Sequence, residues 1–128
     1  MVDGAAWNPA DAWVLASIGV YQRPCSLLEV LAAGDWMNHA VLEEQEVDEA
    51  LSKLVGAGMV RIYDDWTFEL TDDGTGVFSA DVRSIQTQLD IIETALSALE
   101  PVRAEVTLPR DAMAQALADY REHGQQGT

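Results

Sequence analysis

The feature that most limits what this chain can fold into is a regular apolar seam towards its C-terminal end. Seven apolar residues follow one another at separations of 4, 3, 4, 3, 4 and 3. This spacing predicts one helix of three heptads, about 33 Å long, with all the apolar side chains on one side. The seam residues are Phe78, Val82, Ile85, Leu89, Ile92, Leu96 and Leu99.

A seam of this size needs a surface to pack against. Burying its side chains contributes on the order of 10 to 20 kcal/mol before entropy is counted. The partner surface is either a second copy of the chain or other helices of the same chain. The positions beside the seam offer no complementary charge pairs that would fix a parallel zipper. We expect a homodimer, with its geometry left open.

Three helices are predicted at the other end of the chain. Asn8-Pro9 is typical of a cap followed by the first helical residue, and this helix ends before Arg23-Pro24. Ser26 and Glu29 have the spacing of a capping box and open the second helix. The third helix covers residues 43–56 and carries one apolar stripe. The stripe consists of Val47, Ala50, Leu51, Leu54 and Val55.

The third helix is followed by two short runs rich in β-branched and aromatic residues, 59–63 and 66–70. Only Asp64-Asp65 separates them. A two-residue polar link of this kind predicts a tight two-stranded hairpin. Thr71 then caps a further helix that leads into the seam.

Beyond the seam the chain becomes less regular. Pro101 ends the seam helix, an extended segment follows over 102–108, and a short final helix begins after Pro109. The last residues are polar and rich in glycine, which predicts disorder. We therefore divide the chain into a first domain (1–77), a helical arm for dimerisation or packing (78–122) and a disordered tail (123–128).

Composition limits the class of protein. With 128 residues, of which 48% are hydrophobic, the chain has enough apolar material for the core of one domain. There are 22 acidic residues and 7 basic ones, a net charge of -15, and such a field repels nucleic acid and anionic lipid. The single cysteine, Cys25, excludes an intrachain disulfide framework and is expected in the core.

Motifs that would indicate other classes are missing from the sequence. No segment has the character of a leader peptide or a membrane span, and we expect a cytoplasmic protein. The sequence contains no phosphate loop, nucleophile elbow or zinc-protease motif, and the Asp-Asp pairs lack the ligand pattern of a calcium loop. We expect a non-enzymatic protein without a cofactor or metal. Trp36 and Trp66 are either core residues or the walls of a small apolar pocket.

The predicted order of three helices, hairpin and helix resembles a winged helix-turn-helix domain. Residues 51–60, LSKLVGAGMV, look like the end of the third helix and the first wing strand. Residues 68–74, FELTDDG, are similar to the exit from the second wing strand in PadR-type and MarR-type regulators. The resemblance implies a mostly helical fold with a small two-stranded wing, followed by a long dimerisation helix and a short last helix.

The resemblance also implies that the third helix and the wing tip touch the partner. In DNA-binding members those positions offer basic or amide side chains to bases and phosphates. Here they are acidic, because residues 29–73 contain twelve acids and two bases, a net charge of -10. The exposed acids of the third helix and wing tip are Glu44, Glu46, Asp48, Glu49, Asp64 and Asp65.

Two functions follow from this conflict between fold and charge. The first is a regulatory or protein-interaction module that binds a basic protein through the acidic third helix and wing. The alternative is a DNA-binding regulator of the PadR or MarR kind, in which Lys53 and Arg61 would contact phosphates.

Overall fold

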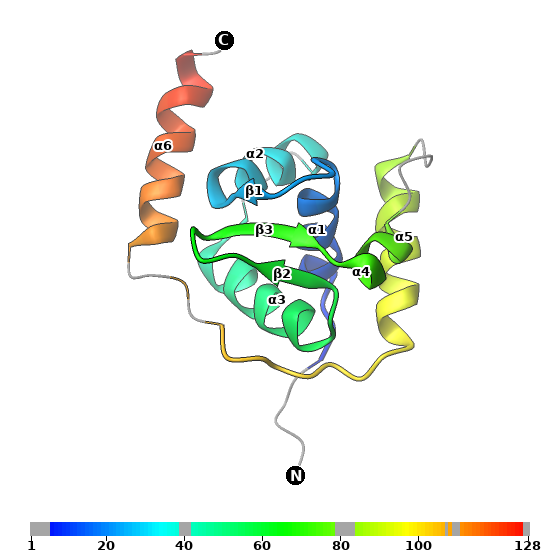
Figure 1. The fold of residues 1–128 in the computed structure, drawn as a ribbon. Helices are drawn as coiled ribbons and strands as arrows, with labels where there is room; N and C mark the ends of the chain where they lie inside the picture. Colours follow the sequence, from blue (N-terminus) through cyan, green and yellow to red (C-terminus); the bar gives the residue numbers. More distant parts are fainter. Residues whose placement is uncertain (1–5, 39–41, 79–83, 107, 109–110, 127–128) are drawn as a thin grey trace.

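The computed structural model describes residues 6–38, 42–78, 84–106, 108 and 111–126 (Figure 1). In these ranges the chain is mostly helical, with a small antiparallel sheet, as the sequence predicts. The helices are α1 (Pro9–Gly19), α2 (Leu27–Asn38), α3 (Glu44–Gly56), α4 (Asp72–Val77), α5 (Ile85–Ser97) and α6 (Ala112–Gln126). The strands are β1 (Cys25–Ser26), β2 (Val60–Ile62) and β3 (Thr67–Leu70).

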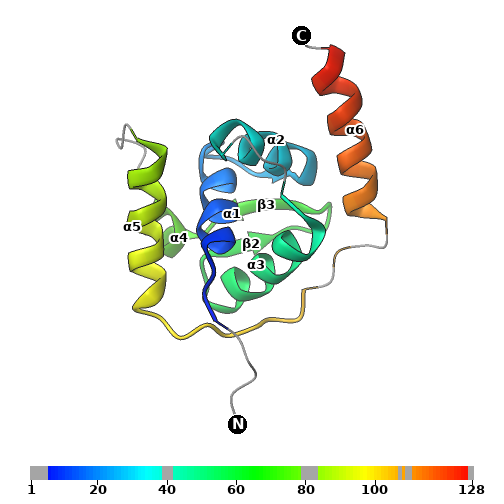
Figure 2. The ribbon, with the colours of Figure 1, turned by 180° about the vertical axis from the view of Figure 1, so that it is seen from behind.

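Helix α1 lies at the centre of the fold. Figure 2 shows α1 in front of the sheet, with α2, α3 and α5 around it. Residues 11–19 of this helix are all buried, which explains why it is apolar on every side rather than along one stripe. Asn8 and Asp11 form the capping box at its start, and Pro9 is its first residue. The predicted first helix is therefore confirmed, although it ends at Gly19.

The sheet has three strands, whereas the sequence predicted two. Strand β1 pairs with β3, with Cys25 opposite Phe68 and Ser26 opposite Thr67. The order across the sheet is β1-β3-β2, and all pairs are antiparallel. A strand of two residues is too short to show an alternating pattern, so sequence periodicity did not reveal it.

The hairpin between β2 and β3 also differs from its prediction. The Tyr63 amide donates to the Thr67 carbonyl at 3.0 Å, and the Trp66 amide donates to the Tyr63 carbonyl at 2.9 Å. The connection therefore has three residues, with Trp66 in the left-handed region at φ 59°. One carboxylate oxygen of Asp65 accepts from the Thr67 amide at 3.2 Å and from its hydroxyl at 2.7 Å. Asp65 thus stabilises the turn.

The prediction of one continuous helix through the seam is wrong. Helix α4 ends at Val77, and Phe78 is extended (φ -95°, ψ 126°). Helix α5 begins at Ile85, because the Ser84 hydroxyl caps it by accepting from the Thr87 amide at 3.3 Å. Ser84 lies between two seam positions, and the spacing of apolar residues does not show that a polar residue between them caps a new helix. Val82 lies outside the described residues.

The described seam side chains pack within the chain. Ile92 and Leu96 are buried on α5, which packs against α1, and Leu89 is half-buried against the same core. Phe78 packs against the core as well, whereas Leu99 is 38% exposed. Packing within the chain therefore accounts for the burial of Phe78, Leu89, Ile92 and Leu96.

The final helix is long rather than short. Helix α6 has 15 residues, against 13 in α5, and it continues to Gln126, beyond the start of the predicted tail at residue 123. It packs against α2, and the Tyr120 hydroxyl donates to the Asp35 carboxylate. This hydrogen bond raises the pKa of Tyr120, because ionisation would place two negative charges together. The arm thus returns to the first domain.

Residues 99–106, here called the strap, connect α5 towards α6. Figure 1 shows the strap running past α3 from one side of the molecule to the other. The described part of the segment predicted to be extended, 102–106 and 108, contains no strand. Instead the Ala104 amide donates to the Ser52 carbonyl of α3 at 2.9 Å, and the Trp7 indole donates to the Leu99 carbonyl at 3.0 Å.

Candidate functional site

Lys53 is buried and cannot reach a phosphate. Its ammonium group lies 2.7 Å from a carboxylate oxygen of Asp11 and 2.6 Å from the Ala6 carbonyl oxygen, to both of which it donates. The ring centroid of Trp7 is 5.9 Å from the same nitrogen. The ammonium thus connects α3 to α1. It is a structural group of the core, not a surface cation.

The other two cations of residues 1–77 also lie beside carboxylates. Arg23 and Glu29 are 2.5 Å apart, and this contact lowers the pKa of Glu29. Arg61 lies 3.9 Å from Glu69 on the exposed face of the sheet. Both pairs are open to water, which screens the attraction between their charges, so they add little to stability. They nevertheless offset each positive charge with a neighbouring negative one.

The acids of α3 divide into two groups. Glu46 and Glu49 face the first turn of α1, where they line a notch together with Glu43. Asp48 instead shares a helical row with Ser52 and Gly56, because these residues are four apart. Glu44 begins the same row and is exposed. The four acids expected to form one face therefore point towards different neighbours.

We call the hollow between α1 and α3 the acidic notch. It has a volume of about 340 Å³. Its lining is Asn8, Pro9, Ala10, Asp11, Glu43, Gln45, Glu46 and Glu49. Glu46 has a structural task as well, since its carboxylate accepts from the Glu43 amide at 2.9 Å in the capping box. The notch offers several carboxylates to a cation, and part of their charge also stabilises the start of α3.

The strap covers the other row of α3. The Ser52 hydroxyl donates to the Val106 carbonyl at 3.5 Å. At Gly56 a Cβ atom would lie 1.7 Å from the Val102 carbonyl oxygen, so only glycine permits this approach. One carboxylate oxygen of Asp48 is buried, with no hydrogen-bond partner in the described part of the chain. The strap thus covers the side of α3 that carries Ser52 and Gly56.

Sequence reasoning missed the roles of Ser52 and Gly56. Both belong to the segment that resembles the end of a recognition helix, but no local pattern shows which distant segment lies against them. The contact partners are about fifty positions away, at Ala104 and Val106. Only the alternation of residues 102–108 gave a signal, which indicated an extended segment without indicating its neighbour.

Asp64 and Asp65 are both exposed at the hairpin turn. Trp36, at 71% exposure, is not a core residue. Trp66 is half-buried and lines a groove with Val60, Ile62 and Val106. This groove does not include Trp36, so the structure does not bring the two tryptophans together in one pocket.

Within the described residues, no group of histidine, cysteine, aspartate or glutamate side chains is arranged to hold a metal ion. In the same ranges no helix combines the length and the apolar character needed to cross a membrane. Comparison of the chain with models of protein families gives no match. Comparisons with curated proteins and with solved structures also give none.

Proposed function

We propose that the chain is a non-enzymatic winged-helix protein that binds a basic segment of a partner protein through its acidic notch. The order α1, β1, α2, α3, β2, β3, with β3 at the centre of the sheet, supports the winged-helix assignment. In that assignment α3 is the recognition helix and the β2–β3 hairpin is the wing. The notch lies at the start of this helix and includes Glu46 and Glu49.

The observation that carries the proposal is the pairing of every cation in residues 1–77. Arg23, Lys53 and Arg61 each have a carboxylate within 4 Å, at 2.5, 2.7 and 3.9 Å respectively. A DNA-binding surface gains affinity by releasing counterions as its cations neutralise phosphates. Each of these cations already has a neighbouring carboxylate. Residues 1–77 therefore offer DNA no cation without such a partner.

Whereas the cations of residues 1–77 are paired, some carboxylates of α3 are free to bind a basic partner. The carboxylates of Glu44 and Glu49 appear in no hydrogen bond or ion pair of the described structure, so a lysine or arginine side chain does not have to displace an existing partner. The net charge of -15 draws a basic segment towards the surface and raises its association rate. Regulation of another protein by occupation of its basic surface is the role that this charge supports.

The experiment compares two single variants of equal net charge. Glu49→Gln removes a carboxylate that lines the notch, and Glu105→Gln removes an exposed carboxylate of the strap. Binding of a fluorescein-labelled peptide rich in lysine and arginine is followed by anisotropy. We expect the first variant to bind about 3- to 10-fold more weakly than the second. Equal loss in both variants would show that only net charge matters.

We also propose a homodimer, formed by the outer side of α5 rather than by the seam. Ile92 and Leu96 are already buried against the chain's own core. Ile91 is 41% exposed on the same helix, and Val102 is 53% exposed on the strap beyond it. These exposed apolar side chains are those that a second copy would cover.

A further inference from the structure

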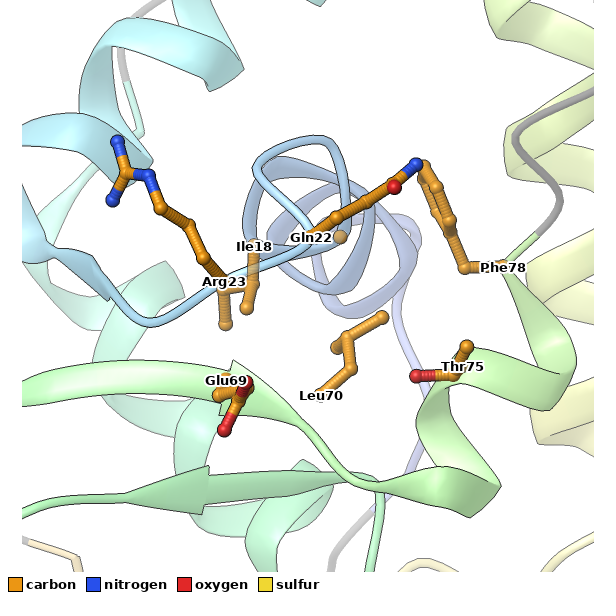
Figure 3. Close-up of a pocket in the computed structure, with 8 residues that line it drawn as sticks. Ile18, Gln22, Arg23, Glu69, Leu70, Thr75 and Phe78 are labelled. Atoms are coloured by element: carbon orange, nitrogen blue, oxygen red, sulfur yellow. The ribbon is translucent and has the colours of Figure 1, made fainter.

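A second hollow lies away from the acidic notch, between the end of α1, strand β3 and helix α4. Its volume is about 310 Å³, at the small end of the range for ligand pockets in proteins. Figure 3 shows the apolar side chains of Ile18 and Leu70 towards its centre, with Phe78 at one side. We call it the Phe78 cavity.

The position of the Phe78 ring depends on Gly19. A Cβ atom at residue 19 would lie 2.8 to 3.0 Å from three carbon atoms of the ring, so the ring packs directly on the backbone of α1. The ring is half-buried and contributes to the lining of the cavity. An aromatic side chain held in this way offers a face or an edge to a second ring.

Two neutral polar side chains, Gln22 and Thr75, line the cavity and are exposed to water. In the described residues neither Gln22 nor Thr75 has a side-chain hydrogen bond. Figure 3 shows Gln22 reaching towards Phe78 and Thr75 pointing inward. Gln22 also has a left-handed backbone, with φ 53°. Glycine adopts that conformation more readily than other residues, so the backbone at position 22 accepts a glycine without strain.

The charged groups nearby limit the ligand to uncharged molecules. The Arg23 guanidinium points away from the cavity in Figure 3 and is engaged by Glu29 at 2.5 Å and by the Pro24 carbonyl at 2.7 Å. Glu69 lines the cavity, accepts from the Tyr63 hydroxyl at 2.5 Å and lies 3.9 Å from Arg61. The charged groups at the cavity are therefore already paired, and an ionic ligand of either sign would lose water without gaining a free opposite charge.

We propose that the Phe78 cavity binds an uncharged molecule with a single aromatic ring, which packs on Phe78 while its polar group hydrogen-bonds Gln22 and Thr75. The probe is benzamide, which combines one ring with a neutral amide. Benzoate has nearly the same shape but is an anion. Binding of each is followed by amide chemical shifts in an NMR titration of the full chain.

We expect benzamide to shift the amides of Gly19, Gln22, Thr75 and Phe78 saturably, with a dissociation constant near or below about 10 mM for so small a ligand. Benzoate should bind at least about 10-fold more weakly, because its charge would lose water while Arg23 and Arg61 are already paired with carboxylates. The absence of saturable benzamide shifts at these amides would overturn the proposal. Equal or tighter binding of benzoate would overturn its claim that the ligand is uncharged.

Matched variants assign the binding to this cavity. Gly19→Ala pushes the Phe78 ring from its place, whereas Gly76→Ala, where a Cβ atom meets nothing within 4 Å, leaves it there. Benzamide binding should be lost in the first and kept in the second. Unchanged binding in Gly19→Ala would contradict the proposed site.

Two further variants test the proposed binding site even if Gly19→Ala does not fold. Gln22→Gly removes the amide at a backbone conformation that suits glycine, and Thr75→Val removes the hydroxyl at nearly constant shape. Each should weaken benzamide binding about 5-fold, the value of one hydrogen bond. If neither changes the dissociation constant, the proposed polar contacts are wrong.

Discussion

Lys53 and Asp11 form an ion pair of 2.7 Å between α3 and α1, and their side chains are 1% and 2% exposed. The two residues are 42 positions apart in the sequence. Since the pair lies where the two helices cross, it fixes their relative positions as well as neutralising both charges. Lys53, which the sequence predicted to be a surface cation, thus lies in the interior of the fold.

Removal of one member of this pair should be costly. Lys53→Met leaves the Asp11 carboxylate buried without its cation, and we expect about 3 to 5 kcal/mol less stability in urea unfolding. Adding Asp11→Asn removes the stranded charge but keeps an oxygen that can accept from the Asn8 amide. The double variant should therefore be more stable than Lys53→Met alone. If Lys53→Met and Asp11→Asn each lowered the stability by less than about 1 kcal/mol, and the double variant by their sum, the pair would be solvated instead.

Gly56 should control the docking of the strap. In Gly56→Ala the new methyl group would lie 1.7 Å from the Val102 carbonyl oxygen, which belongs to backbone and must move. We expect faster hydrogen exchange at the Ala104 amide, which donates to Ser52, and a lower melting temperature. Gly76→Ala is the control, because its methyl group meets nothing within 4 Å. Unchanged exchange at Ala104 in Gly56→Ala would show that the strap does not depend on this contact.

Cys25 should be unreactive in the folded protein. It is fully buried, and burial raises the pKa of its thiol from 9.0 to about 12. Because the thiolate is the nucleophile, a thiol reagent at pH 8 should react slowly with the native chain and rapidly after unfolding in urea. A native rate equal to that of the unfolded chain would contradict the buried position.

The same pKa shift predicts a dependence of stability on pH. The folded state holds the thiol proton more tightly than the unfolded state, so the contribution is complete below pH 9 and is lost as pH rises from 9 towards 12. Cys25→Ala removes this contribution. Its unfolding free energy should therefore fall less steeply over that pH range than that of the native chain. Parallel curves for the two proteins would be inconsistent with the shift.

The two neighbouring isoleucines of α5 test the homodimer. Ile91 is 41% exposed and Ile92 is fully buried, so Ile91→Glu should leave the fold intact and give a monomer in sedimentation. Ile92→Glu places a charge in the core and should lower the stability by several kcal/mol. A native chain that sediments as a monomer at tens of micromolar would contradict the dimer.

Local signals in the sequence predicted the positions of α1 to α4 and of the two strands of the β2–β3 hairpin. The caps at Asn8 and Thr71 and the stripe of α3 indicated real elements, because each depends on residues within one or two turns. The seam failed for a related reason. Its apolar spacing continues past Ser84, although the backbone turns out of the helix before that cap. Periodicity shows which side chains are apolar, and it does not show that the helix between them is continuous.

The candidate site was only partly predictable. Charge located the acids of α3, since composition is visible in any sequence. The positions of Lys53 in the core and of the strap over Ser52 depend on contacts 42 and 54 residues apart. No local pattern encodes such pairs. The sequence therefore predicted Lys53 as a possible phosphate contact, whereas in the fold it forms an ion pair with Asp11.

The proposal that this chain binds protein rather than DNA is tested most directly by titrating it into labelled duplex DNA at low salt. Anisotropy should show no saturable binding, even at a salt concentration of about 20 mM, where phosphate contacts are strongest. Saturable binding of the duplex would contradict the account.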